Sequence, residues 1–408
     1  MILSLLLFIH SFTASFHAGA IMPDGKVDKL VQTPGKWHAP VYGVELAMDF
    51  APEWQALQQW NNATIGAALG YWNLGHDQLG HAITPYIYMD IPLVRRPHFE
   101  LGLRPGVGAA FVTKTYRNTV PDGHLFVDVI GANQSIGSVT NLYFPEVVYM
   151  RFPISRGWAV SLAGGWYHIS NGSTRQPNSG YNIFAGELGV TKKFDPQSPF
   201  FYHEDREVAE EVACQPPAED SNKKSKKWSV ALSATMSGRQ VYYRDQQTFL
   251  VSSMHASAYW HAHNIFRLGG GVDVFYDGAY IQRETPFGKT NLSLAQPGDC
   301  WRVGVSIQPE FVVGNFTAGL HVGAYMYDPV KALEPQWRDD GLPQERLDKP
   351  IFYAYDLLNA GSAGYPDGWL YTEVVLRYHL PWHIFVQAMM KSHLTKVEFV
   401  SLGIGLWY

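Results

Sequence analysis

Large apolar residues alternate with small or polar residues through residues 158–170. The large side chains stand at even positions, namely Trp158, Val160, Leu162 and Trp166. His168 and Ser170 continue the same even-numbered series. Because successive side chains of a β-strand point to opposite faces, a period of two predicts a strand whose even residues share one face. We therefore expect His168 and Ser170 on the apolar face, near the end of a strand.

The same alternation recurs along most of the chain. It predicts strands at residues 41–50, 64–73, 82–91, 99–112, 143–152, 158–170, 182–190, 228–236, 249–260, 266–276, 301–312, 316–327, 371–380, 383–390 and 397–408. The last segment has apolar residues on one face, small or polar ones on the other, and the aromatic Tyr408 at its end. This pattern is typical of the closing strand of a bacterial outer-membrane barrel. We predict an all-β fold, an antiparallel transmembrane β-barrel of about 14 strands within a range of about 12 to 16.

Composition favours a barrel in a membrane over a soluble domain. Charged residues make up 16% of the chain, against about a quarter in soluble domains, while aromatic residues reach 14%. No stretch reaches the ~18 consecutive apolar residues that a membrane-spanning helix needs. A large secreted all-β protein remains the soluble alternative. The net charge of −5 argues against nucleic acid as a partner.

The N-terminus and one charged segment suggest how the chain is divided. Residues 3–9 are apolar and Ala18-Gly19-Ala20 fits a cleavage site, so residues 1–20 are predicted to be a signal peptide and 21–40 an irregular lead. Residues 195–227 hold clusters of Glu and Lys and break the alternation. We interpret 195–227 as a charged periplasmic linker or insertion in a single barrel, between a first part (41–194) and a second part (228–408).

Connection lengths predict the direction of each strand. Outer-membrane barrels have short periplasmic turns and longer external loops. The short turns at 92–97 and 153–157 are therefore predicted to be periplasmic, and the longer segments 114–141, 171–181, 278–299 and 329–368 external. The strand that ends at Ser170 then runs outward, which places His168 and Ser170 at its outer end.

The same topology bears on the cysteines and on a histidine pair. It puts Cys214 on the periplasmic side and Cys300 near the outer rim, so no disulfide is expected between them. His261 and His263 share one face of a strand, as a pair of metal ligands would. No carboxylate or cysteine stands near them in the sequence, so no metal site is predicted.

A motif follows the strand that ends at Ser170. The residues His168-x-Ser170-Asn171-Gly172 and then Gln176-Pro177-Asn178-x-Gly180 resemble the PagL family of lipid A 3-O-deacylases. Members of that family are outer-membrane barrels that hydrolyse an ester-linked acyl chain on lipid A. The chain of 408 residues is longer than the small barrel of that family, and it resembles a longer group labelled acyloxyacyl hydrolase.

The resemblance implies a role for each matching residue. Ser170 matches the nucleophile and His168 the general base. Asn178, with Asn171 and Gly172 in the same loop, matches the region that stabilises the oxyanion. The family's site lies on the outer, lipid-facing surface, where an acyl chain of lipid A in the outer leaflet would contact the large residues at positions 158, 160, 162 and 166. No cofactor is implied.

One position departs from the family pattern. The third member of the family's triad is a glutamate, and the matching residue here is Asn182. An amide offers no charge to the imidazolium, and an acid-to-Asn replacement in a serine protease lowered turnover about 10⁴-fold, although Cys-His-Asn sites do use an Asn. Glu187 has the opposite parity and is expected to face the lumen, while Glu146 on a neighbouring strand is a further acid to consider.

Two functions are compatible with these patterns. The first is an outer-membrane serine esterase acting on lipid A, with Asn182 orienting His168. The second is a non-catalytic barrel, structural or a small-solute channel, that retains the hairpin. The extent to which side chains fill the lumen discriminates between them.

Overall fold

The computed structural model describes most of the predicted strand segments. The described residues are 9–22, 40–50, 55–120, 133, 135–155, 157–194, 227–240, 248–278, 284–285, 288–289, 297–328, 370–393 and 396–408. The predicted lead at 21–40 lies largely outside them, and so do the charged segment 195–227 and the external segment 329–368. None of the described helices is both long and apolar enough to cross a membrane.

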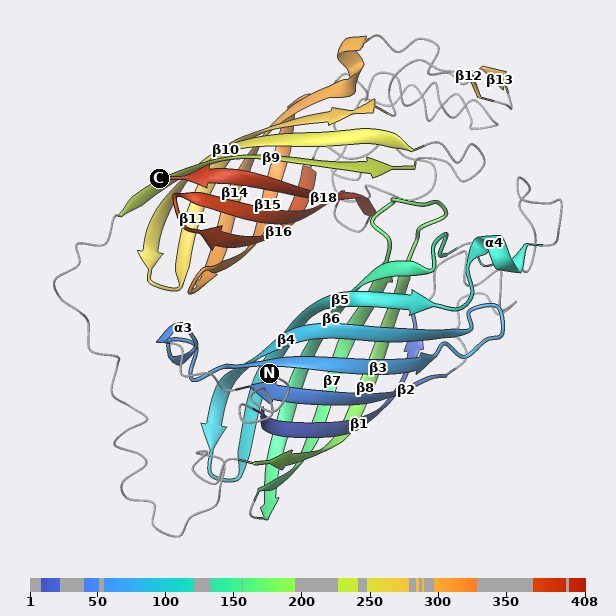
Figure 1. The fold of residues 1–408 in the computed structure, drawn as a ribbon, viewed down its shortest axis with the longest axis vertical. Coiled ribbons are helices and arrows are strands. Elements are labelled where there is room, and N and C mark those ends of the chain that lie inside the picture. Colours follow the sequence, from blue (N-terminus) through green and yellow to red (C-terminus); the bar gives the residue numbers. More distant parts are fainter. Residues whose placement is uncertain are drawn as a thin grey trace, which may run out of the picture. The chain divides into compact units, whose positions relative to one another are not determined.

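The first part of the chain forms a closed antiparallel barrel of eight strands (Figure 1). Its strands are β1 (Ile9–Ile21), β2 (Val41–Phe50), β3 (Thr64–Asn73), β4 (His81–Arg96), β5 (Phe99–Val112), β6 (Thr140–Ser155), β7 (Trp158–Ser170) and β8 (Tyr181–Lys193). Each strand pairs with the next, and β1 pairs with β8 from Ser11↔Lys193 to Ile21↔Ile183. Short helices α3 (Gln55–Gln58) and α4 (Tyr116–Thr119) lie in the connections.

The second part forms another closed barrel of eight strands. Its strands are β9 (Trp228–Arg239), β10 (Phe249–His263), β11 (Phe266–Asp277), β14 (Trp301–Val313), β15 (Phe316–Tyr327), β16 (Leu370–Leu380), β17 (Ile384–His393) and β18 (Lys396–Trp407). The barrel closes where β18 pairs with β9. Three short elements lie between β11 and β14. Two strands of two residues each, β12 (Glu284–Thr285) and β13 (Gly288–Lys289), pair with one another, and the 3-10 helix η3 covers Pro297–Cys300.

Alternation of side chains gives each barrel an apolar exterior and a mixed interior. In β8, Phe184, Leu188 and Val190 are exposed, while Glu187 and Thr191 on the opposite face are buried. In a closed barrel one face of each strand points outward and the other into the lumen. The exposed face is thus apolar from Phe184 to Val190, as expected of a surface in contact with lipid.

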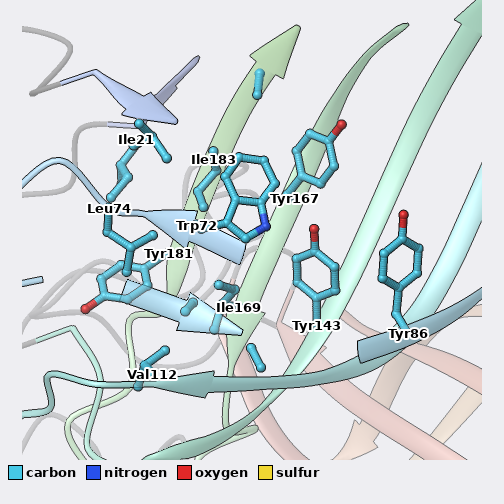
Figure 2. Close-up of a cluster of buried hydrophobic side chains, with 14 of the residues drawn as sticks. Ile21, Trp72, Leu74, Tyr86, Val112, Tyr143, Tyr167, Ile169, Tyr181 and Ile183 are labelled. Carbon is cyan, nitrogen blue, oxygen red and sulfur yellow. The ribbon is translucent and has the colours of Figure 1, made fainter. Parts of the chain in front are cut away.

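The interior of the first barrel is filled by aromatic rings and ion pairs. Figure 2 shows Trp72, Tyr143 and Tyr167 side by side in this core, and the Trp72 and Tyr167 ring centroids are 5.0 Å apart. Farther along the lumen, Arg104 donates to Asp90 through Nε (2.6 Å) and Nη2 (3.0 Å), and Arg151 donates to the same carboxylate. Buried charges are tolerated when they are paired in this way.

The prediction of an antiparallel all-β barrel is confirmed, and the sixteen barrel strands lie within the predicted range. The prediction of a single barrel is wrong, because the strands close into two barrels of eight. Periodicity shows which segments are strands, but closure depends on which distant strands pair. The pairings β1–β8 and β9–β18 leave no sign in the local pattern.

The predicted signal peptide at 1–20 also conflicts with the structure. Residues Ile9–Ile21 form β1, which pairs with β2 on one side and with β8 on the other. Ser11, Thr13 and His17 point into the lumen, whereas Phe16 is exposed on the outer face. The segment is apolar enough to suggest a leader, yet its polar residues alternate as the inner face of a barrel strand requires.

Candidate active site

The β7–β8 hairpin carries the predicted catalytic residues. The two strands pair antiparallel, and the register places His168 directly opposite Asn182. Ser170 is the last residue of β7, two positions beyond His168 on the same side. The exposed residues of this face are Trp158, Leu162 and Trp166, with exposed fractions of 44%, 49% and 37%, and Val160 between them is partly buried. The predicted outward face is therefore present.

Asn182 holds the imidazole of His168. The His168 Nδ1 and Asn182 Oδ1 atoms are 2.8 Å apart, and Trp166 Nε1 donates to the same Oδ1 at 3.1 Å. An indole N–H can only donate, so the Asn182 atom between the two rings is the oxygen. His168 Nδ1 therefore carries the hydrogen and donates it to Asn182. The other ring nitrogen, Nε2, is left as the basic one.

Aromatic rings surround His168. Its ring centroid is 5.3 Å from that of Trp166 and 6.4 Å from that of Phe144, which stands opposite it on β6. The interplanar angle with Phe144 is 25°, a stacked arrangement. These contacts restrict the ring to the plane in which Nδ1 meets Asn182. The part that Trp166 and Phe144 play was not apparent from the sequence, because pairing across strands cannot be inferred from one strand.

Gly180 is the point at which His168 and Ser170 approach each other. A Cβ at this position would lie 3.1 Å from His168 Cε1 and 3.1 Å from Ser170 Cβ. The two side chains therefore border the same small space. Gly180 also has a φ of +75°, a conformation that favours glycine. Both the backbone angle and the lack of space explain why the motif has glycine here.

The loop after Ser170 is fixed by Asn178 and by the connection between β5 and β6. Asn178 Oδ1 accepts from the backbone N–H of Asn171 at 2.9 Å, and Asn178 forms a β-bridge with Ile136. Asn171 Nδ2 donates to Ser138 Oγ at 2.8 Å. The Oδ1 contact sets the orientation of the Asn178 amide. Asn178 is thereby held in the loop that follows Ser170.

The two carboxylates considered as substitutes for the triad acid lie elsewhere. Glu187 is buried on the inner face of β8, as its parity predicted. Glu146 is on the outer face of β6 and stands opposite Trp166 in the register, while Phe144 is opposite His168. The Nδ1 position of His168 is occupied by Asn182. Neither glutamate takes the place of the orienting residue.

The other residues noted in the sequence lie away from this hairpin. His261 Nε2 is 2.8 Å from Ser229 Oγ, and His263 Nδ1 accepts from the backbone N–H of Ile265 at 3.4 Å. Cys300 is buried. Cys214 falls outside the described residues, so the absence of a bond between the two cysteines stays a prediction.

Comparisons with known families match both halves of the chain. Residues 42–191 match the family model of lipid A 3-O-deacylase (PagL), and residues 226–342 match that of the acyloxyacyl hydrolase C-terminal domain. These two ranges fall on the first and the second barrel, respectively. A search of curated proteins found no match to the chain.

A search of solved structures matches part of the chain to two outer-membrane proteins. The outer membrane enzyme PagL is 18% identical with a TM-score of 0.29, covering 43% of this chain and 97% of its own. Neisserial surface protein A is 12% identical with a TM-score of 0.27, covering 45% of this chain and 97% of its own. Family membership comes from the family models rather than from these two structures.

Proposed function

Because the chain belongs to the lipid A 3-O-deacylase (PagL) family of outer-membrane barrels, we propose that it is a serine esterase with Ser170 as its nucleophile. The substrate is lipid A of the outer leaflet, and the bond cleaved is the ester of one acyl chain. The observation that carries the proposal is the hydrogen bonding of Asn182, which puts the hydrogen of His168 on Nδ1 and leaves Nε2 as the basic nitrogen, in a ring that borders the same space at Gly180 as Ser170 does.

Acylation begins with attack of Ser170 Oγ on the ester carbonyl carbon. His168 Nε2 takes the hydroxyl proton as the new C–O bond forms. The carbonyl oxygen becomes an oxyanion, and Asn178 Nδ2 donates a hydrogen bond to it. When the ester C–O bond breaks, the imidazolium returns its proton to the sugar oxygen, which leaves as a hydroxyl. The acyl chain is then attached to Ser170.

Deacylation repeats these steps with water. His168 Nε2 removes a proton from water, the hydroxide attacks the acyl carbonyl, and Ser170 leaves with the proton returned by His168. During both steps the positive imidazolium donates through Nδ1 to the oxygen of Asn182. This amide is a dipole without a full charge. It holds the ring in position but stabilises the cation less than a carboxylate would.

The outer face of β7 supplies a surface for the acyl chain. Trp158, Leu162 and Trp166 are exposed in the same row that leads to His168 and Ser170. An acyl chain that lies along this row remains in the hydrocarbon region of the membrane while its ester reaches Ser170. Recognition of the chain then needs little desolvation of polar groups.

The channel alternative has less support from the structure. An eight-stranded barrel has an interior just wide enough to be filled by side chains. In the described residues of the first barrel the lumen holds buried aromatic rings and the Arg104–Asp90–Arg151 cluster. In the second, Arg302, Tyr371 and Phe275 are among the fully buried side chains. Both lumens therefore resemble packed cores.

Mass spectrometry of lipid A from cells that express the protein tests the proposal. The wild type should remove one ester-linked acyl chain, and Ser170→Ala should remove none. Asn182→Glu should act at least about tenfold faster than the wild type, because a charged orienter contributes up to about 10⁴-fold in serine hydrolases. Asn182→Ala should be about fivefold slower, the loss expected from one hydrogen bond worth about 1 kcal/mol.

Glu146→Gln provides a matched control. It removes a carboxylate from the same outer face, one residue pair away from His168, without removing a hydrogen bond from the ring. Its rate should equal that of the wild type. If folded wild-type protein leaves lipid A intact, or if Ser170→Ala retains the activity, the proposal is wrong. A loss of activity in Glu146→Gln would instead make Glu146 the missing acid.

A further inference from the structure

The lumen of the second barrel contains a cluster of two carboxylates and two imidazoles. His255 on β10 is paired in register with Asp273 on β11, and His321 on β15 is paired with Glu373 on β16. All four side chains are buried. Ligand atoms of His255, Asp273 and Glu373 lie within 4.8 Å of one another. The four residues come from strands β10, β11, β15 and β16, all of the second barrel (Figure 1).

The two carboxylates of this cluster differ from the other buried carboxylates of the second barrel in the kind of residue that pairs with them. The buried carboxylates described in the second barrel are those of Asp273, Asp277, Glu310, Glu373 and Glu398. Asp277, Glu310 and Glu398 each have an Arg or Lys within 4.0 Å. Asp273 and Glu373 have only histidines at that distance among the described residues. Lys391 stands opposite Glu373 in the register, but its ammonium pairs with Glu398. Within 4.0 Å the described residues therefore give these two buried carboxylates no permanently charged partner, which is costly unless a positive charge compensates.

The carboxylate of Glu373 lacks hydrogen bonds as well as a cationic partner. Its carboxylate is fully buried, and neither Oε1 nor Oε2 has a hydrogen-bond partner. His321 Nδ1, at 3.5 Å from Glu373 Oε2, has none either. Buried carboxylate oxygens almost always accept hydrogen bonds. A carboxylate that faces a histidine and a second carboxylate without any such bond has the arrangement of a ligand for a cation.

The distances suit a small divalent ion. His255 Nδ1 is 2.8 Å from Asp273 Oδ1 and 3.9 Å from Glu373 Oε2. Bonds of about 2.1 Å in tetrahedral geometry separate ligand atoms by about 3.4 Å, between these two values. An ion at the centre of the three atoms would therefore need only small side-chain movements, and its two positive charges would match the two carboxylates.

Neighbouring groups already orient two of the three ligands. His255 Nε2 is 2.8 Å from Ser253 Oγ, which leaves Nδ1 directed at the carboxylates. Tyr371 donates from its hydroxyl to Asp273 Oδ2 at 2.5 Å. Histidine and carboxylate ligands in metal sites are normally held by such outer hydrogen bonds. The tyrosine ring has room because Gly304 and Gly323 lie against it, where a Cβ would come within 2.5 Å and 2.1 Å of ring or hydroxyl atoms.

We propose that the second barrel binds one divalent transition-metal ion, of which Zn²⁺ is the type, through His255 Nδ1, Asp273 and Glu373. Imidazole together with carboxylates suits zinc, and three protein ligands leave the fourth position to water. His321 lies beside Glu373, with its Nδ1 3.5 Å from Oε2, and its Nε2 contacts Glu310. The site is separate from the esterase residues, and the proposal does not depend on lipid A as a substrate.

The same residues also include a serine–histidine–aspartate chain, because Ser253 contacts His255, which contacts Asp273. This chain is a poor candidate for a second esterase. Ser253 is buried in the lumen and its Oγ is 2.6 Å from Thr235 Oγ1. An acyl ester would have to enter a filled eight-stranded barrel, whereas a metal ion needs no more space than the three ligand atoms already enclose.

Zinc titration of the full chain in detergent tests the proposal. Protein stripped with a chelator should take up one Zn²⁺ per chain by calorimetry and elemental analysis, and Co²⁺ should give the visible absorption of a tetrahedral site. Glu373→Gln and His255→Gln should each lower the Zn²⁺ affinity at least about 100-fold. The two variants lie on different strands, so the test still holds if one of them fails to fold. Heat-dependent migration in gels shows whether each variant is folded.

The double variant His261→Ala/His263→Ala is the matched control. It removes the histidines at the end of β10 but none of the three ligands. Its Zn²⁺ binding should equal that of the wild type. The proposal is overturned if the folded wild type takes up no stoichiometric Zn²⁺, if Glu373→Gln and His255→Gln bind it as the wild type does, or if only the His261/His263 variant loses it.

Discussion

The tautomer of His168 is set by the indole of Trp166 and the amide of Asn182. Trp166 forces the oxygen of Asn182 toward His168, and that oxygen in turn requires the hydrogen on His168 Nδ1. The consequence for catalysis is that Nε2 is ready to accept a proton from Ser170. Trp166 therefore has two roles, since it also lies on the exposed face that would meet the acyl chain.

Replacing Trp166 with Phe separates these roles. Trp166→Phe keeps an aromatic ring on the outer face but removes the N–H, so Asn182 can rotate and present its NH₂ to His168. We expect kcat for deacylation to fall about fivefold, the effect of about 1 kcal/mol, with KM nearly unchanged. Trp158→Phe is the control at the other end of the same row, where the ring contacts Lys192 rather than the site. Equal kcat for both variants would contradict the orienting role.

At the scale of the strands, the sequence predicts well what depends on neighbouring residues. The strands β3, β5 and β7 have the predicted bounds, because their alternation is regular from end to end. The turns predicted at 92–97 and 153–157 are shorter in the structure, because β4 continues to Arg96 and β6 continues to Ser155. His168 and Ser170 lie on the predicted face for the same reason. The contact of Trp166 with Asn182 joins two strands, and the periodicity of either one does not contain it.

Strand β1 shows where apolar character misleads. Its alternating Ser11, Thr13 and Ser15 face the lumen, but its apolar residues fit a leader equally well. Without β1 the edges of β2 and β8 would be unpaired within the membrane, which is costly because lipid offers no hydrogen bonds. We expect the mature protein isolated from the outer membrane to retain residues 9–21. Mass determination of its N-terminus checks this, and a mature chain beginning near Ile21 would contradict the assignment of β1.

At the scale of the whole molecule, each half has a complete hydrogen-bonded circuit of its own. The first barrel closes through β1 and β8 and the second through β9 and β18. The two family models fall on different barrels, which agrees with this division. A barrel without free edges needs no strand from elsewhere to satisfy its backbone. The sequence pattern predicts one barrel and the structure has two, because the number of barrels depends on which distant strands pair with one another.

Separate production of the halves tests this division. Residues 1–227 and residues 228–408 should each fold in detergent into a barrel that migrates differently before and after heating. Circular dichroism should show that each fragment alone has the strand content that its barrel has in the full chain. If either fragment remains unfolded under conditions in which the full chain folds, the barrels do not close independently.

The central claim is that Ser170 is a nucleophile activated by His168, and covalent labelling tests it most directly. The folded wild type is treated with a fluorophosphonate, which reacts with activated serines, and the modified residue is identified by tandem mass spectrometry of peptides. We predict one adduct, on Ser170, that is absent in His168→Ala. An unlabelled Ser170 in folded wild type, or equal labelling in His168→Ala, would contradict the account.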